Sequence, residues 1–189
     1  MPTAVEVTLD DRWFLAIPAA SEIERWAAHS TSELLIDPER QDDPQAVAAD
    51  LRGFAELADE DAVANLLFCP DGLPGRAIVS VYAAPTDLAS LDDLFDEAPA
   101  SIPRQVLPFG EMDASQARII STIQQLPEGG VLGILQLQRL VDGHLVEAIV
   151  ASPSLNHLGA GLPLFTELTA RVALVDTAST EGSPLGQSA

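Results

Sequence analysis

The sequence predicts an α+β fold, a single domain in which an antiparallel sheet is flanked by helices. Strand-like runs gather in the second half of the chain, and helical patterns occur at only a few points, without strict strand–helix alternation. The 189 residues are 47% hydrophobic, enough for one sizeable core. We expect residues 1–176 to form this domain and residues 177–189, which lack apolar periodicity, to be a disordered tail.

The first expected element is a β-hairpin. Residues 4–9 and 12–17 alternate between apolar and polar side chains, and the pair Asp10–Asp11 between them can turn. Pro18 is expected to end the second strand.

Two amphipathic helices are expected next. Ser21 and Glu24 have the spacing of a capping box at the start of the first helix. Asp43 and Pro44 suit the N-cap and first position of the second. The expected buried positions are Ile23, Trp26, Ala27, Ser30 and Leu34 in the first helix, and Val47, Leu51, Phe54, Ala55 and Ala58 in the second.

Residues 68–76, FCPDGLPGR, lie between two strand-like runs at 63–68 and 77–83. Because Pro-Asp-Gly and Pro-Gly favour turns and proline lacks an N–H donor, a hairpin connection is favoured over an anion-binding loop. A short acidic helix is expected at 87–98. Its outward carboxylates are the candidate partner-binding residues: Asp92, Asp93, Asp96 and Glu97.

The strongest local signal is Asp142–Gly143, which separates the runs 131–141 and 144–151 and is typical of a two-residue type I′ turn. This turn sets Leu135 opposite Val150 on one face of the sheet and Gln138 opposite Glu147 on the other. A further strand is expected at 116–125, and a closing helix at 162–175.

The kind and number of basic residues in the chain exclude several functions. It carries 29 Asp and Glu against nine basic residues, all of them arginine, for a net charge of −20. Schiff-base chemistry, pyridoxal-phosphate catalysis and a Walker phosphate loop all need a lysine. The scattered arginines disfavour nucleic acid and anionic membranes, whereas a protein partner with a basic surface is favoured.

No residue pattern indicates a cofactor, metal or catalytic site. Cys69, the only cysteine, ends a strand before a proline, where no helix N-terminus can lower its pKa, so we expect a small buried hydrophobe. His144 and Glu147 are three apart on a strand and point to opposite faces. The amino terminus lacks the pattern of a signal peptide and no run of ~20 apolar residues occurs, so a cytoplasmic protein is expected.

The order of elements resembles the PsbP-like α/β/α sandwich. The resemblance lies in RWFLAIP, AIVSVYAAPTDLASLDDLF, the strands of 116–151 and LPLFTELTARVAL. Members of that family include a photosystem II subunit, a Ran-binding nuclear import factor and secretion chaperones. The resemblance implies the fold and a protein-binding role, and it transfers no functional residues.

Two function classes follow, and the oligomeric state stays open. The first is a non-enzymatic protein-binding adaptor or chaperone-like domain that acts through a sheet face or edge. The second is a small-molecule-binding domain or enzyme with a pocket between sheet and helices. Its candidate residues are Trp13, Trp26, Tyr82 and Cys69.

Overall fold

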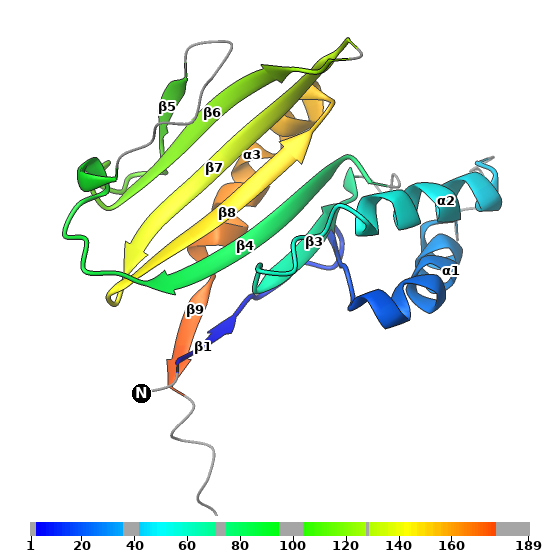
Figure 1. The fold of residues 1–189 in the computed structure, drawn as a ribbon, viewed down its shortest axis with the longest axis horizontal. Coiled ribbons are helices and arrows are strands. Elements are labelled where there is room, and N and C mark those ends of the chain that lie inside the picture. The colour runs from blue at the N-terminus through cyan, green and yellow to red at the C-terminus, as the bar shows by residue number, and fades with distance from the viewer. Residues whose placement is uncertain (1–2, 36–41, 71–74, 95–103, 128, 177–189) are drawn as a thin grey trace, which may run out of the picture.

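A computed structural model describes residues 3–35, 42–70, 75–94, 104–127 and 129–176. Within these ranges seven strands form one antiparallel sheet in the order β2-β3-β4-β8-β7-β6-β5, and β1 pairs with β9 in a separate ribbon (Figure 1). The α+β class is therefore confirmed. The strands are β1 (Thr3–Glu6), β2 (Phe14–Ala16), β3 (Ala64–Phe68), β4 (Ala77–Pro85), β5 (Gln105–Pro108), β6 (Ala117–Gln125), β7 (Val131–Val141), β8 (His144–Ser152) and β9 (Ala173–Asp176).

The β7–β8 hairpin has the register that the sequence predicts. Asp142 and Gly143 both have positive φ, 47° and 71°, as a type I′ turn requires. Leu135 pairs with Val150, and Gln138 pairs with Glu147. The strands expected at 63–68, 77–83 and 116–125 are confirmed as β3, β4 and β6.

Helix α3 (Leu155–Ala170) covers one face of the sheet and encloses the main core. Its Phe165 ring packs edge-on against Phe68 of β3, with centroids 4.9 Å apart, and Phe14 of β2 joins them. Gly161 lets the helix approach this closely, since a Cβ there would come within 3.0 Å of the Phe68 ring. Such aromatic contacts add roughly 0.5–1.5 kcal/mol per pair beyond area burial.

Helices α1 (Ile23–Leu34) and α2 (Pro44–Ala55) form a second core at the β2–β3 edge. This core lies on the opposite face of the sheet, because Leu67 belongs to it while its neighbours Leu66 and Phe68 belong to the main core. Asp43 caps α2 as expected, accepting a hydrogen bond of 3.0 Å from the Gln45 N–H.

Arg139 of β7 ties the sheet to the end of α3. Its Nη1 donates to the carbonyl oxygens of Thr169 and Ala170, at 2.7 and 2.8 Å. These carbonyls belong to the last turn of the helix, where carbonyls lack intrahelical partners and cations are favoured. A charged side chain of the sheet therefore stabilises the helix terminus that closes the core.

The hairpin expected from 4–9 and 12–17 is wrong. β1 pairs with β9, and β2 pairs with β3, so the two segments do not pair with each other. The turn between them is present, with Trp13 and Phe14 donating to the Asp10 carbonyl. Alternation identified the strands, but it holds no information on which distant strand each one meets.

Three helix boundaries also differ from expectation. The capping box at Ser21 is absent, because a 3-10 turn, η1 (Ala20–Glu22), precedes α1 and Glu22 is the N-cap. Residues 87–90 are irregular and only η3 (Leu91–Asp93) is helical, while 95–98 lie outside the described residues. The closing helix begins earlier, after its N-cap Ser154, and residues 173–176 form β9. Pro163, which suits a helix start, lies inside α3.

No helix in the described ranges is long and apolar enough to cross a membrane. The tail expected at 177–189 lies outside the described residues.

Replacing Arg139 with methionine keeps the apolar stem and removes both hydrogen bonds to α3. We expect the free energy of unfolding in urea to fall by about 1.5–3 kcal/mol, the range for hydrogen bonds to a charged group. Arg25→Ala is the matched control, because Arg25 is 81% exposed in its ion pair with Glu22 and should change stability by less than about 0.5 kcal/mol. Equal losses for the two variants would contradict the capping role.

Candidate functional site

The candidate site is a groove of about 470 Å³ between the start of α1, the end of α2 and the start of β3. We call it the β3 groove. It exists because β2 pairs only with Leu66–Phe68, so the beginning of β3 has a paired strand on its β4 side alone. The groove is lined by Ile17, Pro18, Ala19, Ala20, Ile23, Ala55, Glu56, Ala58, Asp59, Glu60, Ala62, Val63, Ala64 and Asn65.

The loop between α2 and β3, which forms one wall of the groove, is fixed by Asn65. The Asn65 side-chain amide donates to the Asp59 carbonyl at 2.8 Å and accepts from the Asp59 N–H at 3.1 Å. Ser80 of β4 donates to the same Asn65 oxygen at 2.8 Å. Because the amide is held from both sides, the wall has a defined position before any ligand arrives.

Tyr82 of β4 anchors the same loop through Asp59. Its hydroxyl donates to Asp59 Oδ2 at 2.7 Å. This hydrogen bond, with a smaller one from the Asp61 backbone N–H, lowers the pKa of Asp59. Burial and then the Asp59 hydrogen bond raise the pKa of Tyr82 to about 12. At neutral pH the pair is therefore a carboxylate that accepts from a neutral phenol.

The lining combines small apolar side chains with carboxylates. Six alanines make the walls smooth, and Glu56, Asp59 and Glu60 are the charged residues among the fourteen that line it. One large apolar side chain of the lining, Val63, is 47% exposed, whereas the exposed Leu57 does not line the groove. An open apolar groove with an acidic rim suits an apolar segment that carries positive charge.

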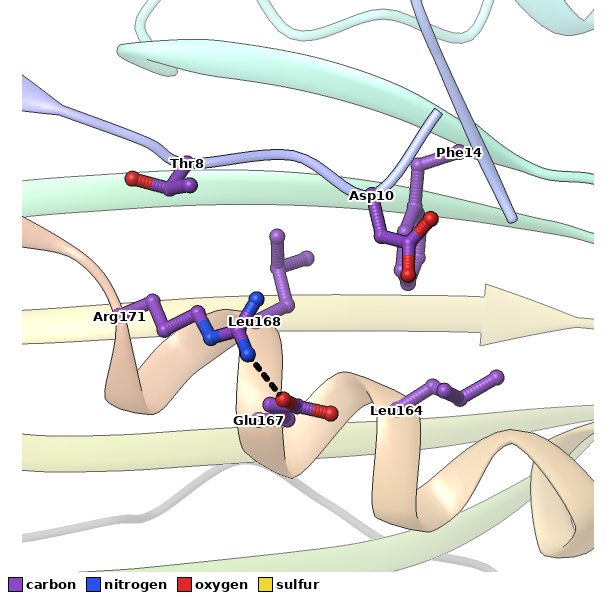
Figure 2. A pocket seen from close by; sticks show the side chains of 7 residues that line it. All are labelled: Thr8, Asp10, Phe14, Leu164, Glu167, Leu168 and Arg171. Carbon is purple, nitrogen blue, oxygen red and sulfur yellow. Dashed lines mark hydrogen bonds and ion pairs between the residues drawn. The ribbon is translucent and has the colours of Figure 1, made fainter. Parts of the chain in front are cut away.

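A second hollow, between α3 and the segment before β2, is too small for a ligand (Figure 2). Its volume is about 20 Å³, room for about one water molecule. Glu167 and Arg171 of α3 form an ion pair at its rim, and Asp10 approaches from the other side (Figure 2). Arg12 lowers the pKa of Asp10 to about 2 through a side-chain hydrogen bond.

The predicted partner-binding carboxylates do not reach the β3 groove where the structure describes them. Asp92 and Asp93 are exposed on η3, which contacts the inner strand β7, separated from β3 by β4 and β8. Asp96 and Glu97 lie outside the described residues. Their partner-binding role stays a prediction.

The four residues singled out for a small-molecule pocket are not gathered around one cavity. Trp13 packs at the margin of the main core, and Cys69 is buried in the second core. Tyr82 anchors the groove wall. Trp26 lines a hollow of about 420 Å³ beside α1, together with Pro18, Glu22, Arg25 and His29.

Cys69 is a buried thiol, 3% exposed, as its apolar context predicts. Burial raises the pKa of Cys69 to about 11, and the opposing effects of the Gly75 backbone and the Arg76 guanidinium are smaller. At neutral pH the sulfur is protonated, so Cys69 lacks the thiolate that a nucleophile needs. Within the described residues, no three His, Cys, Asp or Glu side chains are grouped to hold a metal ion.

The sequence contains only a weak signal for the β3 groove. Residues 55–64, AELADEDAVA, read as the end of a helix followed by an acidic turn. Leu57 and Val63 in this segment are apolar residues in a polar context, which single exposed hydrophobics often are. Val63 becomes part of a groove only because the start of α1, more than twenty residues away in the sequence, forms another wall.

Comparison with known proteins found no family model that matches the chain and no curated protein similar to it.

Iodoacetamide should alkylate Cys69 slowly in the folded chain at pH 7.5. A thiol pKa raised from 9.0 to about 11 lowers the thiolate fraction about 100-fold, and burial slows access further. Mass spectrometry after timed quenching measures the rate, and the urea-unfolded chain is the fast reference. Labelling of the folded chain at the unfolded rate would contradict a buried, protonated thiol.

Tyr82→Phe should raise the pKa of Asp59 toward its ordinary value of 3.8. The lowered pKa means that ionised Asp59 adds stability above this value, which is lost as pH falls through the folded pKa. The stability difference between wild type and variant should therefore shrink at acid pH. Carboxyl ¹³C NMR measures the titration, with Asp113, whose pKa is lowered by Ser115, as internal control. An unchanged Asp59 pKa would show that Tyr82 does not hold the carboxylate.

Proposed function

We propose that the chain is a protein-binding domain, adaptor-like or chaperone-like, that receives an apolar segment of a partner in the β3 groove. The observation that carries the proposal is an open groove of about 470 Å³ with mostly apolar walls, among them the exposed Val63, and with one wall fixed by Asn65 and Tyr82. Apolar surface exposed in a groove and bordered by polar residues is typical of interaction sites. Preorganisation of the wall reduces the entropy lost on binding.

The partner segment should carry lysine or arginine beside its apolar residues. Glu56, Asp59 and Glu60 place negative charge at the groove, and the chain as a whole has a net charge of −20. The negative electrostatic potential of these charges speeds the encounter with a basic partner, and added salt weakens this effect. The resemblance to PsbP-like proteins suggests the same class of role, and the cytoplasm is the compartment that we propose.

A small-molecule ligand is the second candidate for the same groove. Its volume of about 470 Å³ falls within the ~300–1,000 Å³ of small-molecule sites, and it lies between helices and sheet. A thermal-shift screen with a metabolite library separates the two candidates. A ligand at 100 times its dissociation constant adds about 2.7 kcal/mol of stability, and a flat response favours the protein partner.

Peptides selected from a displayed random library against the whole chain should bind in the β3 groove. Val63→Asp puts charge on its apolar wall, and we expect the dissociation constant to rise about 10–100-fold, as loss of a buried valine contact predicts. Fluorescence anisotropy with synthetic peptides gives the constants.

Val106→Asp is the matched control for this experiment. Val106 is 64% exposed on β5, at the far edge of the sheet from the groove, so its variant should bind as the wild type does. If both variants lose affinity equally, or if the library yields no binder, the groove is not a protein-binding site.

A further inference from the structure

A second hollow, of about 420 Å³, lies beside α1 and next to the β3 groove. We call it the Trp26 hollow. Its lining is Pro18, Glu22, Arg25, Trp26 and His29. The side chains of Glu22, Arg25 and His29 are 49%, 81% and 72% exposed. Trp26 packs against the second core and is partly exposed. The hollow is therefore open to a ligand and offers it one large apolar side chain.

Apolar surface connects the β3 groove with the Trp26 hollow. Pro18 lines both of them. On α1, Ile23 lines the groove and Trp26 lines the hollow. Residues three apart on a helix are neighbours, with Cβ atoms about 5–6 Å apart. The strip that runs from the groove to the hollow consists of four residues, all at least partly exposed: Val63, Pro18, Ile23 and Trp26.

Charge differs between the two ends of this strip. Three carboxylates and no cationic side chain are found among the described residues that line the groove. In the Trp26 hollow, Arg25 forms an ion pair with Glu22, so the two charges cancel. A lysine or arginine of the partner is attracted to the groove, whereas burying it against Trp26 would cost desolvation without an unpaired anion in return. The side chain that suits the hollow is therefore uncharged and apolar.

We propose that the partner segment in the β3 groove has a second anchor, an aliphatic or aromatic side chain that packs on Trp26. This inference rests on the proposed function, since it concerns the same partner segment. Tryptophan is enriched among the few interface residues that carry most of the binding energy. Contact with the second core already restricts the Trp26 side chain, so it loses little freedom on binding. The recognised segment carries its cation at the groove and an uncharged apolar residue at the hollow.

Trp26 fluorescence tests the second anchor. The chain has two tryptophans, so Trp13→Phe leaves Trp26 as the only one. Tryptophan-free peptides selected from the displayed library against the whole chain are titrated into this variant. We expect the emission to shift to the blue and acrylamide quenching to fall, because a packed apolar side chain shields the indole from water. Trp26→Phe leaves only Trp13, at the margin of the main core, and as the matched control should show no shift.

Paired changes in peptide and protein test the charge argument. The peptide residue on Trp26 is the one whose replacement by alanine abolishes the blue shift. Replacing this residue with lysine should raise the dissociation constant about tenfold. Arg25→Glu turns the neutral ion pair of the hollow into two glutamates, and it should recover most of this loss for the lysine peptide. A variant that merely fails to fold cannot gain affinity, so this recovery is independent of folding defects.

The results separate this inference from the proposed function. Peptides that lose affinity for Val63→Asp but leave the Trp26 emission unchanged would overturn the second anchor and leave the proposed function intact. A peptide that shifts the Trp26 emission yet binds Val63→Asp as tightly as the wild type would show that the hollow is a separate site, which also contradicts the inference. A library without binders would reject the groove as a protein-binding site, and the second anchor with it.

Discussion

The register of the β7–β8 hairpin determines which side chains of the central strands enter the core. Asp142 and Gly143 set this register through their positive φ angles. With it, Leu135 and Val150 face α3 while Gln138 and Glu147 face away. A shift by one residue would place the glutamine and the glutamate against the apolar face of α3, and burying them without partners would cost several kcal/mol. The position of Arg139, which caps α3, depends on the same register.

As a result, the two faces of the sheet are covered by different elements. One face is dry and carries α3. The other carries α1 and α2 at the β2–β3 edge, and the β3 groove lies beside them. The groove is lined by three carboxylates, those of Glu56, Asp59 and Glu60. The sheet therefore uses one face for the main core and the edge of the other for the groove.

Local signals in the sequence predicted local structure. Asp142–Gly143 gave the hairpin and its register, and Asp43 with Pro44 gave the start of α2. The pairing of β1 with β9 could not be predicted, because it depends on strands about 170 residues apart. The same limit applies to the β3 groove. Its walls come from segments whose contact depends on Asn65 and Tyr82, and hydrogen bonds between distant side chains leave no periodic pattern in the sequence.

The pairing of β1 with β9 also bears on how the protein is made. β1 is synthesised about 170 residues before its partner β9. The inner strand β4 likewise waits for β8, whose residues follow more than fifty positions later. Closing such long loops is slow. The apolar strands β3 and β4 are therefore made about 70 residues before α3 begins. Until α3 emerges, their apolar face lacks its cover and is prone to aggregate.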